Sequence, residues 1–186
     1  MEKANRNLSV EVLLDELTNI SNRRGVKRYI SMLTKASELK SFSAALLMRD
    51  IDYFKRYNDN HGHLEGDVCI KKIANSLKSV FGNRCGILGR FCGEEFVCFI
   101  KDVEYREVLE LAELLRFSIE NLNMNYIWDN VSYPVTISIG GVYVCNLGFN
   151  SIHEMYSIAD EELYKAKNTG RNKVVLRNKS LKEISE

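Results

Sequence analysis

The sequence lacks a large excess of charge of either sign, because its formal net charge at pH 7 is +1 over 186 residues. Without a strong positive charge, nucleic acid is not an expected partner, and without an acidic excess, a disordered chain is not expected either. Low-complexity segments and internal repeats are also missing. With 45% hydrophobic and 27% charged residues, the chain is expected to form one globular domain with its own core.

The cysteines lack the spacing of a metal site, because none of them forms a CxxC pair or a Cys/His zinc pattern. An odd and scattered set indicates reduced thiols in a cytosol. No apolar run is long enough to cross a bilayer, and the first residues carry no signal-peptide hydrophobic stretch. We therefore expect a cytoplasmic protein without a membrane segment, and with free thiols at Cys69, Cys85, Cys92, Cys98 and Cys145.

The most informative stretch is residues 90–96, with the sequence RFCGEEF. The apolar segments 85–91 and 95–100 flank it, which predicts a β-hairpin. Its tip carries two adjacent carboxylates, Glu94 and Glu95. Like charges at a tight turn repel, so a divalent-cation site is one interpretation of the pair. A solvated turn is the other, and this stretch alone favours neither.

Carboxylates also follow the apolar segment 42–48, which predicts a buried strand ending at Asp50. Next to the hairpin, they can converge on Mg²⁺, which prefers hard oxygen ligands. In the polar stretch that follows, Asn58 can both donate and accept, and Asp67 can accept from two donors, a combination that suits the edge of guanine. The alternative for Asp67 is an N-cap or first-turn residue of the next helix.

Periodicity predicts the remaining elements. We expect a lead-in helix carrying Val10, Leu13, Leu14 and Leu17, and a strand over 134–144 that is kinked or bulged at Gly140 and Gly141. Ser151 and Glu154 form a capping box for the last helix. Further helices are expected around residues 26–33, 67–81, 108–122 and 155–166, and a final strand over 173–176.

Two pairs of cations have two interpretations each. Arg23 and Arg24 either contact phosphates or tie their loop to the body by charge-assisted hydrogen bonds, and the second is favoured. Lys167 and Arg171, four residues apart, either grip a triphosphate or compensate a helix dipole. On spacing alone, the dipole interpretation is favoured.

Five blocks in order give the chain a specific resemblance from Asp15 onward. It resembles a GGDEF domain, the diguanylate cyclase family, in residues 15–24, 50–67, 90–96, 136–140 and 159–172. The resemblance implies an α+β, nucleotidyl-cyclase or palm-like fold, with a mainly antiparallel central sheet flanked by helices and a β-hairpin carrying the signature. It places a lead-in helix or linker at 1–14, the domain at 15–178 and a tail at 179–186.

The resemblance also implies an activity: two GTP molecules, one in each protomer of a face-to-face homodimer, condense to cyclic di-GMP and two pyrophosphates. Asp50, the Ile51 carbonyl and Glu94 would hold Mg²⁺ or Mn²⁺, with Glu94 also a candidate base. Lys55, Lys167 and Arg171 would neutralise the triphosphate. Asn58 and Asp67 would read guanine, with His63 close by.

Two positions depart from the family pattern. The first glycine of the signature is Cys92, so Gly93 is expected to supply the positive φ, as the second central residue of the turn. The family's Arg-x-x-Asp product-inhibition site falls on Asn83 and Gly86, with Arg84 out of register, so that site is expected to be absent.

Three classes of function follow. The first is an active diguanylate cyclase with a weak homodimer, and the alternative is a catalytically silent module that binds GTP or a protein partner. A nucleic-acid polymerase palm is disfavoured because no basic groove accompanies the site. A regulatory domain or partner outside this sequence is compatible with either of the first two.

Overall fold

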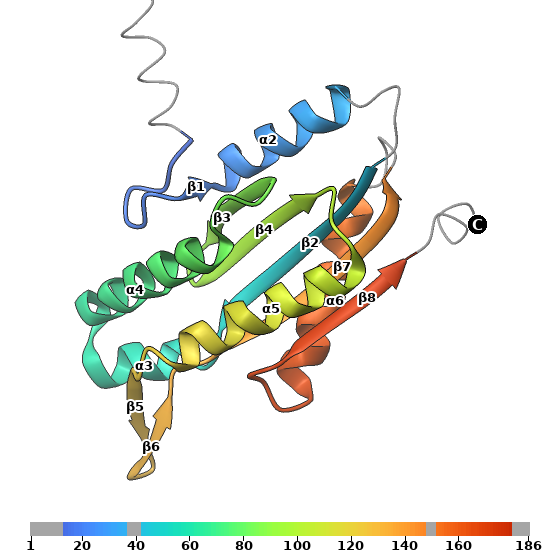
Figure 1. Cartoon of the computed structure of the whole chain (residues 1–186). Coiled ribbons are helices and arrows are strands. Elements are labelled where there is room, and N and C mark those ends of the chain that lie inside the picture. Colours follow the sequence, from blue (N-terminus) through green and yellow to red (C-terminus); the bar gives the residue numbers. More distant parts are fainter. Residues whose placement is uncertain (1–12, 37–41, 148–151, 180–186) are drawn as a thin grey trace, which may run out of the picture.

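The computed structural model describes residues 13–36, 42–147 and 152–179. In these ranges one mixed sheet has the strand order β1-β3-β4-β2-β7-β8 (Figure 1). The central pairs are antiparallel, whereas β1–β3 and β7–β8 at the two edges are parallel. The expected mainly antiparallel α+β sheet is therefore confirmed. Its strands are β1 (Ser21–Asn22), β2 (Phe42–Ile51), β3 (Gly86–Cys92), β4 (Glu95–Lys101), β7 (Ile137–Leu147) and β8 (Val174–Lys179).

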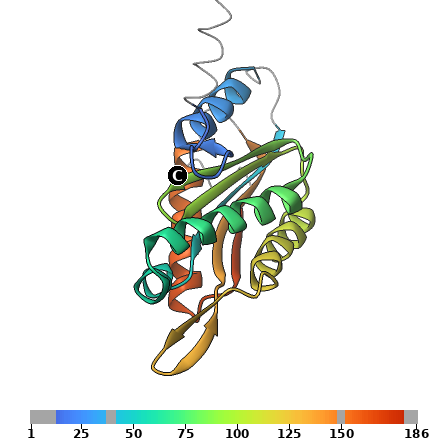
Figure 2. The same ribbon diagram turned by 90° about the vertical axis from the view of Figure 1, so that its left-hand side faces the viewer.

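Helices cover both faces of this sheet (Figures 1 and 2). The helices α4 (His63–Phe81) and α5 (Tyr105–Glu120) pack on one face, and α2 (Arg23–Ala36) and α6 (Ile152–Asn168) on the other. The central strand β2 contributes to both cores, since Leu47 belongs to the first and Leu46 and Met48 to the second. A strand covered on both faces is apolar throughout rather than alternating, which is why its sequence is one continuous apolar run.

A separate two-stranded hairpin, β5 (Asn125–Trp128) and β6 (Val131–Pro134), projects beyond one end of the sheet (Figure 2). It lies beside α3 (Phe54–His61), where Asn60 and Ile127 exchange two hydrogen bonds of 3.1 and 3.2 Å. The strand expected over 134–144 is therefore divided, because Pro134 ends β6 and β7 begins only at Ile137. The sequence analysis did not predict this hairpin.

Two further expectations about the backbone are wrong. Leu13 to Leu17 form turns and a bridge between Leu14 and Ser21 instead of a helix, while residues 1–12 lie outside the described residues. The glycines of β7 are not bulged, because Gly140 and Gly141 pair in regular register with β2. A Cβ on Gly140 would lie 1.9 Å from the Leu163 nitrogen, so this glycine is needed for the close approach of α6.

Ser151 lies outside the described residues, so the capping box expected there stays a prediction. None of the helices within the described ranges is both long and apolar enough to cross a membrane. The expected cytoplasmic location remains a prediction as well.

Candidate functional site

The signature hairpin turns through Gly93 and Glu94, between the paired residues Cys92 and Glu95. Gly93 has a φ of 46° and is the only one of these four with a positive φ. A positive φ at the first central residue alone is typical of a type II′ turn. Gly93 thus supplies the positive φ as expected, but as the first central residue instead of the second. Cys92 ends β3 with an exposed side chain and no unusual φ, so it does not prevent the turn.

Asp50 lies at the end of β2, directly across the ladder from Glu95. Its Oδ2 atom is 2.9 Å from Nζ of Lys167, near the end of α6. The pKa of Asp50 is raised to about 6. Burial is the largest cause, the Lys167 hydrogen bond and charge lower this pKa, and the charges of Glu94 and Glu95 raise it. Residues from three separate blocks of the sequence therefore meet at one point. Their combined negative charge is what a bound cation would stabilise.

The donor set at this point suits Mg²⁺ or Mn²⁺. Asp50 and Glu94 offer carboxylate oxygens, and Ile51, the last residue of β2, offers a main-chain carbonyl. Within the described residues there is no cluster of three or more His, Cys, Asp or Glu side chains placed to hold a metal. Two carboxylates and one carbonyl are nevertheless sufficient for Mg²⁺, which keeps several waters and completes its shell with substrate phosphates. These residues would hold the ion.

Asp52, two residues further on, has a structural role that the sequence analysis did not assign. Its buried carboxylate accepts hydrogen bonds from Thr136 Oγ1 at 2.7 Å, Ser138 Oγ at 2.6 Å and the Asn172 backbone N–H at 3.0 Å. These three hydrogen bonds join the end of β2 to the start of β7 and to the segment after α6. The one indication of this role in the sequence is that Thr136 and Ser138 both lie in the matching block 136–140.

The two residues expected to read guanine come from neighbouring helices. The Oδ1 atom of Asn58, on α3, is buried and has no hydrogen-bond partner among the described residues. A Cβ on Gly66 of α4 would lie 1.9 Å from that atom, so the glycine makes the room in which the amide lies. A buried acceptor without a donor is costly unless a ligand supplies one.

Asp67 is exposed and lies in the second turn of α4, whose N-cap is Gly62 with a φ of 84°. The alternative of an N-cap or first-turn role for Asp67 is therefore wrong, since Glu65 is the acidic residue of the first turn. His63 is the first residue of α4 and is exposed. The side chain of Asp67 is accordingly available for a ligand.

The three cations expected to face a triphosphate lie on different elements. Lys55 is exposed in the first turn of α3, and Lys167 is paired with Asp50. Arg171 follows α6 with a φ of 61° and donates from Nη1 to the Tyr53 hydroxyl at 2.9 Å. Lys167 lies in the last turn of α6, as the dipole interpretation expected, but its ion pair gives it a specific partner as well.

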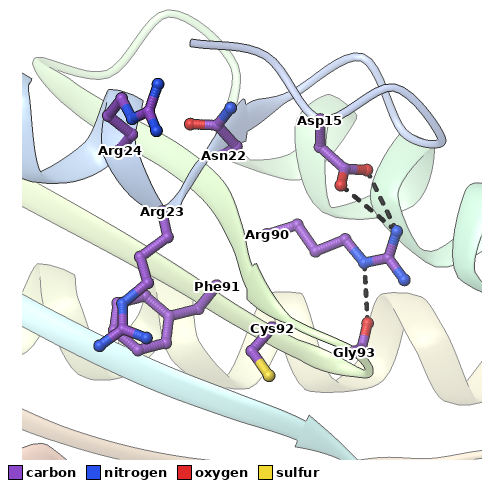
Figure 3. A pocket seen from close by; sticks show the side chains of 8 residues that line it. All are labelled: Asp15, Asn22, Arg23, Arg24, Arg90, Phe91, Cys92 and Gly93. Atoms are coloured by element: carbon purple, nitrogen blue, oxygen red, sulfur yellow. Dashed lines mark hydrogen bonds and ion pairs between the residues drawn. The ribbon is translucent and has the colours of Figure 1, made fainter. Parts of the chain in front are cut away.

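A pocket of about 370 Å³ lies on the other side of the signature hairpin, between β3 and the start of α2 (Figure 3). Arg90 joins its two walls, because Nε donates to the Gly93 carbonyl at 2.7 Å and Nη1 to Asp15 at 3.2 Å. Although burial acts in the opposite direction, hydrogen bonds from Thr18 and Arg90 lower the pKa of Asp15. The signature turn is thereby fastened to the N-terminal loop.

Arg23 and Arg24 both line this pocket, and their contacts differ from the favoured interpretation that they tie their loop to the body. The loop is held by Asp15 and by Asn22, whose Nδ2 donates to the Leu14 carbonyl at 3.0 Å. The Arg23 guanidinium lies 4.5 Å from the centre of the Phe91 ring instead of donating to the loop, and Arg24 lines the pocket (Figure 3). Among residues 13–36, 42–147 and 152–179, neither arginine donates the expected charge-assisted hydrogen bond to the loop.

The positions of the family's product-inhibition site are occupied differently. A Cβ on Gly86 would lie 2.1 Å from the Phe99 carbonyl oxygen, so β3 leaves no room for a side chain there. Arg84 is engaged elsewhere, since its Nη1 donates to the carbonyls of Val80 and Phe81 at 2.6 and 2.7 Å and caps α4. The exposed Asn83 precedes it.

The fold is that of a nucleotidyl-cyclase-like domain. Comparison with known families agrees, because the family described as diguanylate cyclase, GGDEF domain, matches residues 12–173. The chain belongs to this family.

Named relatives are similar over most of this chain. It is 37% identical over 169 residues to the probable diguanylate cyclase DgcT of Escherichia coli K12, covering 88% of this chain and 35% of that protein. It is 35% identical over 142 residues to diguanylate cyclase A of Treponema denticola, covering 76% and 37%. The chain thus spans little more than a third of the length of these relatives.

A solved structure supports the fold. The coiled coil and GGDEF domain of DgcB from Caulobacter crescentus, in complex with c-di-GMP, superimposes with a TM-score of 0.83 and covers 94% of this chain and 91% of that one. The two sequences are 24% identical, so this likeness concerns the fold alone.

Proposed function

We propose that this chain is a diguanylate cyclase that condenses two GTP molecules to cyclic di-GMP and two pyrophosphates. The observation that carries the proposal is the meeting of Asp50, Glu94 and Lys167. Asp50 forms an ion pair of 2.9 Å with Lys167, and burial, helped by the charges of Glu94 and Glu95, raises the pKa of Asp50 to about 6. Membership of the family and the similarity to two relatives named as diguanylate cyclases support it.

The residues of the chain divide the work of the reaction. Asn58 and Asp67 orient guanine, and Lys55, Lys167 and Arg171 bind the triphosphate, so that the reacting groups are aligned. The 3′-hydroxyl of one GTP loses its proton to Glu94 and bonds to the α-phosphorus of the other GTP, while the bond to pyrophosphate breaks. When bound, Mg²⁺ or Mn²⁺ would lower the pKa of that hydroxyl and stabilise the negative charge on the leaving group. Fixed cations such as Lys167 stabilise the same charge.

The reaction requires a homodimer, because each protomer binds one of the two reacting nucleotides. We expect this dimer to be weak. The specific activity should therefore rise with protein concentration in the micromolar range. A constant specific activity, together with a monomer in sedimentation with GTP, would contradict the dimer.

Incubation with GTP and Mg²⁺, followed by chromatography of the products, tests the proposal. Cyclic di-GMP and pyrophosphate in a ratio of about one to two are expected from the stoichiometry of the reaction. If the protein binds GTP but all of the GTP remains unreacted, the catalytically silent alternative is favoured. The observation that favours that alternative is Cys92, which occupies the position of the signature's first glycine, next to the turn.

A further inference from the structure

Tyr53 has a backbone conformation that is unusual for an aromatic residue. It lies in the left-handed region, with φ 54° and ψ 30°, at the N-cap position of α3, where its side chain makes no capping hydrogen bond. Such a conformation persists only where the surroundings hold the residue in place, and it is typical of functional sites. The preceding residue, Asp52, is fixed by its buried hydrogen bonds to β7 and to Asn172.

The ring of Tyr53 carries Arg171. The Arg171 guanidinium lies 4.2 Å from the ring centre, and its Nη1 donates to the Tyr53 hydroxyl at 2.9 Å. Arg171 itself has a φ of 61° and follows Gly170, with a φ of 119°, so the chain turns sharply to bring this side chain onto α3. A guanidinium has five N–H donors, so one bond to Tyr53 leaves the others for a phosphate.

A second arginine braces the same ring. The guanidinium of Arg56 lies 4.5 Å from the centre of Tyr53 and 4.1 Å from that of Trp128 in β5. Trp128 belongs to the hairpin that Asn60 fastens to α3. Trp128, Arg56, Tyr53 and Arg171 thus form one continuous cation–aromatic stack. In the described part of the chain both arginines contact aromatic rings and neither forms an ion pair with a carboxylate, so their positive charge is left for an anion.

We propose that Tyr53 is a positioning residue that holds Arg171 for the triphosphate of GTP, and that Arg56 and Trp128 hold Tyr53. The proposal rests on the proposed function, which assigns Arg171 to the triphosphate. A free arginine side chain loses considerable rotamer entropy when it binds a phosphate. The stack removes that cost before the ligand arrives, and preorganisation of this kind increases affinity.

The test compares two ligands that differ in their phosphates. GMP and the non-reacting α,β-methylene analogue of GTP are titrated with Mg²⁺ into wild type, Tyr53→Leu, Arg171→Gln and the double variant. Tyr53→Leu should weaken binding of the analogue about fivefold to thirtyfold, the loss expected for a misplaced charge-assisted contact, and leave GMP binding unchanged. The double variant should bind the analogue no more weakly than Arg171→Gln, because both changes remove the same contact.

Matched variants separate positioning from a general structural role. Tyr133→Leu is the control, because Tyr133 and Tyr53 are both 40% exposed and Tyr133 stacks on Tyr126 instead of carrying Arg171. Tyr53→Phe, which keeps the ring, should restore most of the affinity for the analogue. If Tyr53→Leu does not fold, Arg56→Gln replaces it, and a smaller loss confined to the analogue is expected.

Three results would overturn the inference: equal losses for GMP and the analogue, additive losses in the double variant, or no loss in Tyr53→Leu. With any of these results, the proposed function would still hold as long as the wild-type protein converts GTP to cyclic di-GMP. A wild type that binds neither ligand would instead overturn the proposed function, and this inference with it.

Discussion

Lys167 and Asp50 form an ion pair of 2.9 Å, yet the pKa of Asp50 is raised to about 6. Burial is the largest cause, and the nearby charges of Glu94 and Glu95 act in the same direction. The Lys167 ion pair therefore does not compensate the burial of Asp50 together with these charges. This imbalance is what we expect of a site that functions with a divalent cation.

The pH dependence of stability tests this imbalance. Because the folded state raises the pKa of Asp50 from 3.8 to about 6, it favours the protonated acid, and stability is lost as the pH rises through this range. In metal-free buffer, Asp50→Asn should therefore raise the free energy of unfolding by about 1–3 kcal/mol at pH 8 and change it little at pH 4. Urea denaturation at both pH values measures the difference.

The control for this experiment is Asp59→Asn, since Asp59 is exposed on α3. It should give the same small change at pH 4 and pH 8. An Asp50→Asn variant that is less stable than wild type at pH 8 would show that the Lys167 ion pair outweighs the burial of Asp50.

Within the described residues, Arg49 places an uncompensated positive charge inside the core. Its side chain is fully buried in β2, and none of its three guanidinium nitrogens has a hydrogen-bond partner among the described residues. Arg49→Met, which keeps most of the volume and removes the charge, should raise the free energy of unfolding by about 1–3 kcal/mol. Thermal or urea unfolding measures this change.

Arg116 provides the matched control for Arg49→Met. It is also buried, but it forms hydrogen bonds of 2.9, 2.9 and 2.7 Å with Glu113, Glu120 and Asn172. Arg116→Met should therefore lower stability. The same sign of change for both variants would contradict the difference between a paired and an unpaired buried arginine.

Feedback inhibition by the product should be weak and competitive only. The backbone at Gly86 leaves no room for a carboxylate, because a Cβ there would lie 2.1 Å from the Phe99 carbonyl oxygen. Gly86→Asp combined with Asn83→Arg should consequently destabilise the protein instead of creating an inhibitory site. Inhibition kinetics with cyclic di-GMP, and thermal unfolding of the double variant, test both statements. Non-competitive inhibition of wild type by micromolar product would show that another inhibitory site exists.

Base selectivity should depend on Asp67. A carboxylate accepts hydrogen bonds from N1–H and the amino group of guanine, whereas adenine presents an acceptor at N1. Leaving such a group unpaired costs about 1–3 kcal/mol, so wild type should prefer GTP over ATP at least tenfold. Asp67→Ser should relax this preference and form mixed GMP–AMP products in a competition with equal GTP and ATP. Mixed products from wild type itself would show that Asp67 does not read the base.

Much of the fold could be predicted from the sequence, because its strongest patterns are local. The apolar run ending at Asp50 and the two apolar segments around Gly93 follow directly from burial on both faces of a sheet. The β5–β6 hairpin could not be predicted in the same way. Its residues Ile127, Trp128 and Val131 are exposed, so it shows no alternation of buried and exposed positions.

The candidate site shows the same division. Asp50 and Glu94 were identified because carboxylates at strand ends and turns are chemically conspicuous. The roles of Tyr53 and Asp52 depend on contacts with Arg171 and Asn172, more than a hundred residues away in the sequence. No local pattern reports such contacts. The need for a glycine at position 140 likewise depends on the approach of Leu163 from another element.

We propose above all that Glu94 acts with a divalent cation in forming cyclic di-GMP. The most direct measurement is the initial rate of cyclic di-GMP formation from GTP, over a series of Mg²⁺ concentrations, for wild type, Glu94→Gln and the control Glu110→Gln on α5. We predict a Mg²⁺-dependent rate in wild type and in Glu110→Gln, and a rate about 10²–10⁴-fold lower in Glu94→Gln, the usual contribution of a general base. An undiminished rate in Glu94→Gln, or cyclic di-GMP formed in excess EDTA, would contradict the account.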